Sequence, residues 1–238
     1  MKVAVNLLLV AGCFASVQAF AQIDEPDINA DCVKAGIYAA AGKVAYQQGD
    51  MGKARDIFRN QVAWSEFCHK PQDQIATAYN NIALTYIKQG DYLKAKAWLM
   101  LAPADKKSQY NLSQMQPKLA ALPPAESPAG IYWQYAGFGS WNILEVKAEE
   151  AQFKIDFSGL YMGQMSLYYG PNMGEFSVVT TIKDNHAVYH ETDDAAVAGG
   201  ECSVDMNFTP QSVKLHTTHD CGFGHNVQAE GEFVRVTP

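Results

Sequence analysis

The residues whose types best suit chemistry are histidines and cysteines near the end of the chain. His216, His219, Cys221 and His225 lie within ten residues of one another, and imidazole and thiolate groups are ligands that zinc prefers. In a strand, however, residues 216 and 219 face opposite sides because their spacing is odd. Cys221 also has a better use in a disulfide, so we expect no metal site and no cofactor.

Catalytic motifs of other kinds are absent from the sequence. It contains no G-x-S-x-G elbow, Walker loop, H-E-x-x-H pair or dinucleotide-binding fingerprint. The one candidate nucleophile is Cys221, which has His225 nearby, and a disulfide would remove its reactive thiolate. We therefore expect a protein that is not an enzyme.

Composition and charge limit the class of protein further. The 238 residues are 48% hydrophobic and 18% charged, which is typical of a globular chain of one or two domains. The 18 basic and 25 acidic residues give a formal net charge of −7, without any cluster of Lys or Arg. Binding to nucleic acid depends on such a basic footprint, so we expect no nucleic-acid partner.

Residues 1–21 are typical of a secretory signal peptide. One Lys precedes an apolar stretch, and Ala19-Phe20-Ala21 offers an A-x-A cleavage site before Gln22. Ser16 and Gln18 interrupt the apolar run before it reaches the ~20 residues that a membrane-spanning helix needs. We predict a periplasmic or secreted protein with no membrane span.

An alternative processing site lies within the same segment. Val10-Ala11-Gly12-Cys13 resembles a bacterial lipobox, in which Cys13 is acylated and becomes the mature N-terminus. The following residues stay largely apolar, whereas a lipoprotein usually turns polar after its cysteine, so soluble export is favoured over a lipid anchor. Either outcome leaves four cysteines, Cys32, Cys68, Cys202 and Cys221, in an oxidising compartment where disulfides persist.

The first part of the mature chain contains an internal repeat. AYQQGDMGKARDIF and TYIKQGDYLKAKAWL align on Gly49 and Gly90, which are 41 residues apart. In the second copy, small and aromatic residues recur at helical spacing on two predicted helices: Tyr79, Ile82, Ala83, Tyr86, Tyr92, Ala95, Leu99 and Ala102. The Gly-Asp pair predicts a turn in which glycine ends one helix and aspartate caps the next.

The pattern over residues 33–103 resembles the tetratricopeptide repeat (TPR). The first copy is looser than the second and has Ala45 where a TPR usually has Tyr. Two such units bury little surface by themselves, and residues 105–122 predict a closing helix that Pro117 would bend or split. Cys32 opens the first predicted helix and Cys68 closes the second, so an antiparallel pair would bring them together in a disulfide.

The resemblance implies a protein or peptide partner, here in the cell envelope, on the concave face of the first helices. The corresponding positions are Lys43, Tyr46, Asn80, Asn81, Leu84 and Lys88. The carboxylate clamp of chaperone-binding TPRs is not supported, because Ala39 and Lys43 stand where that clamp needs Lys and Asn. A purely scaffolding role for these side chains stays open.

A proline-rich linker, residues 123–130, separates the helical domain (22–122) from a second domain (131–238). Hydrophobic periodicity changes there from 3.6 to 2. Strands are predicted at Gly130–Tyr135, Trp141–Lys147, Gln152–Phe157, Leu160–Tyr169, Glu175–Ile182, His186–His190, 202–208, Val213–Thr217 and Glu232–Val236. Eight or nine short strands indicate an antiparallel barrel or sandwich, with an up-and-down barrel preferred. The fold class is therefore α+β in two domains.

The other two cysteines belong to one predicted hairpin. A turn at Thr209-Pro210-Gln211 would set Phe208 opposite Ser212 and Cys202 opposite Thr218. A bulge near residue 220 would then bring Cys221 to Cys202. The sequence predicts a second disulfide there.

The tail CGFGHNVQAEGEF (221–233) resembles a C-G-F-G-H-x-V terminal motif of exported bacterial domains that have no established activity. The resemblance implies a β-rich exported module. The glycines predict a tight crossing of backbone segments, with His225 and Asn226 as hydrogen-bonding residues. Of the many aromatic side chains in the second domain, most belong to its core. The rest predict a partner or ligand patch together with the tail: Trp133, Tyr135, Phe138 and Tyr168 with His225 and Asn226.

These features predict an exported, non-enzymatic adaptor whose TPR unit docks a partner and whose β domain binds a partner or ligand. The alternative is an inhibitor of a cell-envelope hydrolase, similar to a lysozyme inhibitor, acting through the β domain and its Ala195–Gly200 loop. A third hypothesis, a small-ligand carrier, requires an open barrel interior.

Overall fold

A computed structural model describes residues 26–191, 202–219 and 221–238. The predicted signal segment, with Cys13 and the cleavage site at 19–21, lies outside the described residues, and so does the 195–200 loop. Within the described ranges, no helix is both long enough and apolar enough to cross a membrane.

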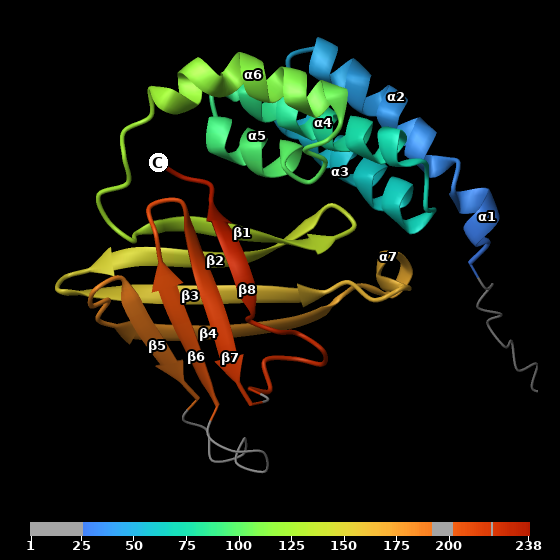
Figure 1. The fold of residues 1–238 in the computed structure, drawn as a ribbon. Helices are drawn as coiled ribbons and strands as arrows, with labels where there is room; N and C mark the ends of the chain where they lie inside the picture. The colour runs from blue at the N-terminus through green and yellow to red at the C-terminus, as the bar shows by residue number, and fades with distance from the viewer. Residues whose placement is uncertain (1–25, 192–201, 220) are drawn as a thin grey trace, which may run out of the picture.

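The first half of the chain is helical, as predicted (Figure 1). Its helices are α1 (Ile28–Asp31), α2 (Lys34–Gln47), α3 (Met51–Phe67), α4 (Gln72–Gln89), α5 (Tyr92–Leu99) and α6 (Lys106–Ala120). The two Gly-Asp turns act as expected only in part, because Asp91 stands at the start of α5 but its side chain makes no capping hydrogen bond. Gly90 ends α4 in the left-handed conformation, and the Asp50 carboxylate accepts a hydrogen bond from the Lys53 backbone N–H at the start of α3. Pro117 does not split α6, which continues through it for one more turn.

The second half forms one antiparallel sheet of eight strands. These are β1 (Gly130–Gly137), β2 (Ser140–Glu149), β3 (Gln152–Tyr161), β4 (Asn172–Thr180), β5 (His186–His190), β6 (Ser203–Phe208), β7 (Ser212–Thr218) and β8 (Gly231–Arg235). The spatial order β4-β3-β2-β1-β8-β7-β6-β5 pairs the first strand with the last. This is the up-and-down order of a barrel that stays open between β4 and β5.

Two details of the sheet correct the sequence analysis. The predicted strand Leu160–Tyr169 is wrong: β3 ends at Tyr161, and a short helix, α7 (Ser166–Tyr169), follows. The β6–β7 register is also one residue away from the prediction, because Phe208 pairs with Val213 rather than Ser212. The reason lies in the turn, where Thr209 Oγ1 accepts the backbone N–H of Ser212 and closes a four-residue loop.

Both predicted disulfides are present. Cys32 and Cys68 join the start of the helical region to the end of α3, with 5.7 Å between their Cα atoms. Cys202, directly before β6, is joined to Cys221, in the loop between β7 and β8, with 5.1 Å between their Cα atoms. Disulfides are typical of proteins in oxidising, extracytoplasmic compartments.

Side chains fill the interior of the barrel. The largest fully buried ones include Tyr132, Leu144, Ile155, Phe157, Met206, Leu215 and Phe233. The loop that joins β7 to β8 (the terminal loop) adds Phe223, whose ring centroid lies 5.2 Å from that of Phe176. A Cβ atom at Gly174 would lie 2.1 Å from the Phe223 carbonyl oxygen, so the predicted tight backbone crossing is confirmed. An interior packed in this way contradicts the ligand-carrier hypothesis.

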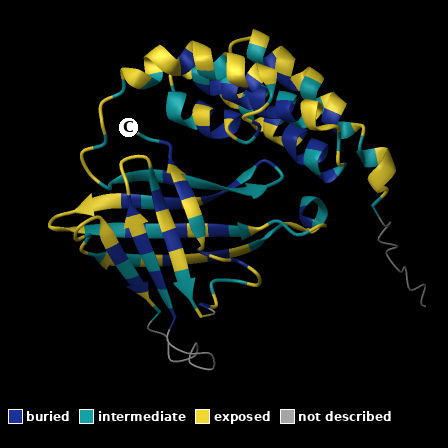
Figure 2. Cartoon of the chain, viewed as in Figure 1, coloured by how far each residue is buried: buried dark blue, intermediate teal, exposed yellow. Residues whose placement is uncertain are grey.

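The helices and the barrel share a hydrophobic core. In Figure 1, α3 and α5 are the helices nearest the sheet, and they lie over β1 and β2. Trp98 of α5 packs edge-on against Trp141 of β2 with 5.1 Å between ring centroids, and Trp133 and Tyr135 of β1 contact the same cluster. Buried positions accordingly gather on the side of the helical layer that faces the sheet, while exposed positions cover its outer side (Figure 2).

Candidate functional site

A groove runs across the helical layer on the side away from the barrel. Three adjoining cavities of about 360, 390 and 580 Å³ make it up, and Thr77 of α4 lines all three. Its walls come from α2, α4 and α6, the first helix of each pair and the closing helix. The second helices, α3 and α5, lie against the barrel, and α3 also contributes Gln61 to the groove floor. The structure therefore leaves open the face for which the sequence analysis predicted partner contacts.

Helical periodicity explains how α4 serves both sides. Tyr79, Ile82 and Ala83 are buried and face the helical core, whereas Thr77, Asn81 and Leu84 line the groove. These two sets lie on opposite faces of one helix because a turn takes 3.6 residues.

The groove carries positive charge in an acidic protein. Its lining includes four lysines, namely Lys43 of α2, Lys70 before α4, and Lys106 and Lys107 of α6. No Asp or Glu occurs among the residues that line these three cavities, although the whole chain has a formal net charge of −7. An anionic ligand is therefore favoured over a cationic one.

Asn80 holds the two walls of the groove together. This buried side chain donates to Ser108 Oγ of α6 at 2.9 Å and to the Ala76 carbonyl at 2.8 Å. Its own oxygen accepts a hydrogen bond from Asn111 of α6 at 2.7 Å. Although Asn80 borders the groove, its polar atoms are used to fix α6 against α4.

The structure brings most of the predicted partner-binding positions together. The largest of the three cavities is lined by Lys43, Tyr46, Asn81 and Leu84. Asn80 lines the smallest, beside α6. Lys88 is exposed beyond the end of the groove and lines none of the three. Sequence reasoning missed Gln61 of α3, which lies on the groove floor, and Thr77 of α4. Thr77 could have been predicted, because it precedes Asn81 by four residues and therefore shares its helix face. Sequence reasoning also missed the α6 residues Lys106, Lys107, Tyr110 and Asn111, because α6 has no repeat signature.

The predicted aromatic patch of the β domain faces the helices. Trp133 contacts Tyr86 of α4, and Tyr135 contacts Tyr79 and Trp98. Phe138, in the β1–β2 turn, and Tyr168, on α7, both pack against Phe67 at the end of α3. These four side chains therefore serve as contacts within the chain.

The two tail residues of that patch lie apart from the four aromatics. His225 is exposed in the terminal loop, where its carbonyl accepts a hydrogen bond from Asn172 Nδ2 at 2.9 Å. Asn226 follows it, also exposed and with a positive φ of 61°. The structure does not join His225 and Asn226 to the aromatic cluster.

A carboxylate at the centre of the interface links three elements. Glu66 of α3 accepts hydrogen bonds from the Tyr79 hydroxyl of α4, the Tyr135 hydroxyl of β1 and the backbone N–H of Phe138. Burial raises the pKa of both tyrosines far above its usual value, and the negative charge of Glu66 raises each further. Both phenols consequently stay neutral and remain donors to Glu66.

A second, smaller contact fixes α7. The Tyr168 hydroxyl donates to Asp31 of α1 at 2.7 Å, and Lys34 pairs with the same carboxylate at 2.7 Å. The hydrogen bonds from Lys34 and Tyr168 lower the pKa of Asp31. Burial and the contact with Asp31 raise the pKa of Tyr168 to about 12. These contacts anchor α7 to the N-terminal end of the helical region.

Comparison with known proteins agrees with the helical part of this description. No curated protein and no solved structure gives a significant match to the chain. A family model described as Tetratricopeptide repeat matches residues 35–102, which lie within the 33–103 stretch where the sequence pattern predicted that repeat. The helices that form most of the groove are therefore a tetratricopeptide-repeat region.

Proposed function

We propose that this protein is an exported, non-enzymatic interaction protein whose TPR groove binds an extended, acidic segment of a partner in the cell envelope. The observation that carries the proposal is the charge of the groove, in which four lysines and no carboxylate line the three cavities. The match to the tetratricopeptide repeat supports a protein partner, and the two disulfides support export to an oxidising compartment.

The barrel has a supporting role in this proposal. By covering α3 and α5 and contributing Trp133, Tyr135 and Trp141 to their core, it replaces the neighbouring repeats that a longer TPR array would supply. The groove is then held by a disulfide at one end and by Asn80 and α6 at the other, so that it is largely preorganised for a ligand.

The test is capture from native envelope extract on immobilised protein, with a groove variant as the matched control. Lys43→Glu combined with Lys107→Glu reverses two exposed charges in the groove without touching the core. We expect a partner that is retained by the natural protein, released by added salt and absent from the variant.

The control variant is Lys53→Glu with Lys183→Glu, which makes the same charge change at exposed positions outside the three cavities. It should retain the partner. Capture of the same proteins by the groove variant would contradict the proposal. Capture of a cell-wall hydrolase whose activity falls on binding, unaffected by the groove variant, would favour the inhibitor hypothesis.

A further inference from the structure

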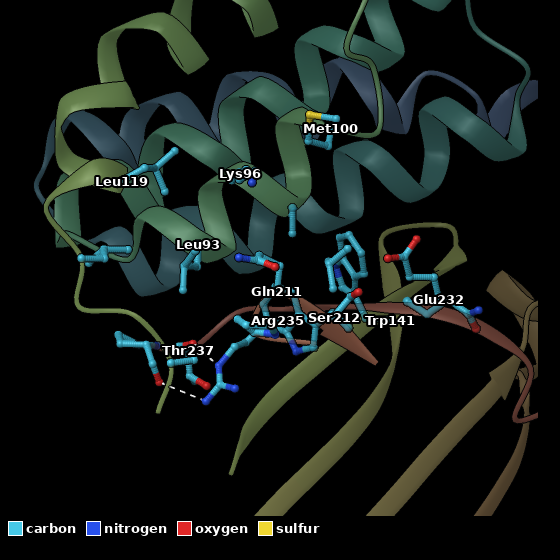
Figure 3. Close-up of a pocket in the computed structure, with 18 of the residues that line it drawn as sticks. Leu93, Lys96, Met100, Leu119, Trp141, Gln211, Ser212, Glu232, Arg235 and Thr237 are labelled. Atoms are coloured by element: carbon cyan, nitrogen blue, oxygen red, sulfur yellow. Dashed lines mark hydrogen bonds between the residues drawn. The ribbon is translucent and has the colours of Figure 1, made fainter. Parts of the chain in front are cut away.

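A further cavity, of about 530 Å³ and separate from the groove, lies between the helical layer and the barrel. Figure 3 shows its two walls, with Leu93 and Lys96 on α5 and Met100 directly after it, and with Trp141, Glu232 and Arg235 on the strands. The proline-rich linker and the β6–β7 turn close its ends. A volume of 300–1,000 Å³ is typical of sites for small organic molecules.

Apolar side chains dominate the lining. They include Leu93, Leu119, Leu122, Trp133 and Trp141. The rings of Trp133 and Trp141 are stacked, 5.2 Å apart. Met100 is 49% exposed and Val234 39% exposed, so that apolar surface remains uncovered at this cavity. Such a surface is suited to a hydrocarbon chain or ring system.

The wall formed by the linker is fixed in place. The Arg235 guanidinium donates to the carbonyls of Ser127, Ala129 and Thr237, and the Tyr132 hydroxyl donates to the Pro128 carbonyl at 2.7 Å. Two consecutive prolines further restrict the segment. The cavity therefore exists before any ligand arrives, which reduces the entropy lost on binding.

One cation of the lining has no partner. Arg235 is engaged by backbone carbonyls, whereas the Lys96 ammonium group has no ion pair or hydrogen bond within the described part of the chain. The one acidic side chain of the lining, Glu232, comes from the opposite wall. Lys96 is therefore free to pair with an anion whose apolar part occupies the cavity.

We propose that this cavity binds a single-chain amphiphile, with the hydrocarbon chain against Trp133 and Trp141 and an anionic head group paired with Lys96. This site is separate from the TPR groove and does not depend on a partner binding there. It would make the contact between helices and barrel a place where a small molecule is held.

The test uses dodecanoate as the probe and dodecanol as the neutral molecule of equal chain length, measured by displacement of a fluorescent anilinonaphthalene sulfonate from the full-length protein. We expect saturable binding of one dodecanoate per chain. Lys96→Gln should raise the Kd of dodecanoate about two- to fivefold, as expected for one exposed ion pair, and leave the Kd of dodecanol unchanged. Met100→Glu, which places a carboxylate at an exposed position of the lining, should weaken both.

Two control variants separate the cavity from the rest of the surface. Lys183→Gln removes a lysine outside the lining, and Val179→Glu adds a charge at a position of β4 that is 48% exposed. Both should bind dodecanoate as the natural protein does. Absence of saturable binding, equal losses for dodecanoate and dodecanol in Lys96→Gln, or undiminished binding by Met100→Glu would each overturn the proposal.

Discussion

Glu66 on α3 and Tyr135 on β1 are joined by a hydrogen bond from the tyrosine hydroxyl to the carboxylate, across 69 positions of sequence. The Tyr135 oxygen also accepts the backbone N–H of Gly139 at 2.9 Å. The contact therefore connects a helix of the TPR region, a strand of the barrel and the tight turn between β1 and β2. It is polar, yet it lies beside the shared aromatic core, where an unpaired polar group is costly.

Glu66→Gln is expected to lower the free energy of unfolding by about 2 kcal/mol. The amide has one acceptor oxygen where the carboxylate has two, and it loses the charge that strengthens the bonds from Tyr79, Tyr135 and the Phe138 backbone. Urea unfolding followed by far-UV circular dichroism measures the change. Glu149→Gln, at an exposed position at the end of β2, is the control and should change stability by less than about 0.5 kcal/mol. Equal stability of the two variants would contradict a structural role for Glu66.

Stability is also expected to fall at alkaline pH. Burial raises the pKa of Tyr79, Tyr86, Tyr132 and Tyr135 above the ordinary value of 10. Because the folded state favours their neutral form, their contribution to stability is complete below pH 10. It declines as the pH rises above 10, where the unfolded chain loses these protons first.

Absorbance at 295 nm, combined with urea unfolding at successive pH values, measures this effect. We expect some of the 12 tyrosines to ionise only when the chain unfolds. The Glu66→Gln variant should lose less stability above pH 10, because the carboxylate raises the pKa of two of these phenols. Ionisation of all tyrosines near pH 10 in the folded protein would rule out the explanation.

The features that could be predicted from the sequence are those that depend on local pattern. Helical spacing around Gly90 predicted α4 and α5, and their turn, because the same residues that form the turn also pack the pair. Alternation from Cys202 to Phe208 predicted β6 and placed Cys202 within reach of Cys221. Short connections predicted the up-and-down order of the strands.

The features that could not be predicted depend on contacts between distant segments. Alternation shows that Trp133 and Tyr135 share one face of β1, but it cannot show whether water or another domain covers that face. The stretch before Gly170 is rich in aromatic residues and was predicted as a strand. It forms α7 instead, where Tyr168 can reach both Phe67 and Asp31. The α6 part of the groove was missed for the same reason, since α6 joins the repeat through contacts between distant residues, such as those of Ser108 and Asn111 with Asn80, and has no repeat pattern of its own.

Removal of the Cys32–Cys68 disulfide is expected to lower stability by about 4 kcal/mol, because the bond closes a loop with a sequence separation of 36. The Cys202–Cys221 bond, with a separation of 19, should contribute about 3 kcal/mol. Paired Cys→Ala variants, compared by urea unfolding, measure each contribution. Since Cys32 borders the groove, the first variant should also weaken partner capture. The second should leave capture unchanged, and equal effects of the two variants on capture would contradict this assignment.

The backbone crossing between β4 and the terminal loop can be tested by adding one methyl group at Gly174. In Gly174→Ala, the added Cβ would lie 2.1 Å from the Phe223 carbonyl oxygen, and rigid backbone on both sides prevents relief. We expect a loss of about 3 kcal/mol in the free energy of unfolding. Gly36→Ala on α2 is the matched control, because its Cβ would meet nothing within 4 Å and alanine favours a helix, for a gain of about 0.5 kcal/mol. Thermal and urea unfolding should separate the two variants in opposite directions from the natural protein. If Gly174→Ala were as stable as the natural protein, the terminal loop could not cross β4 at this point.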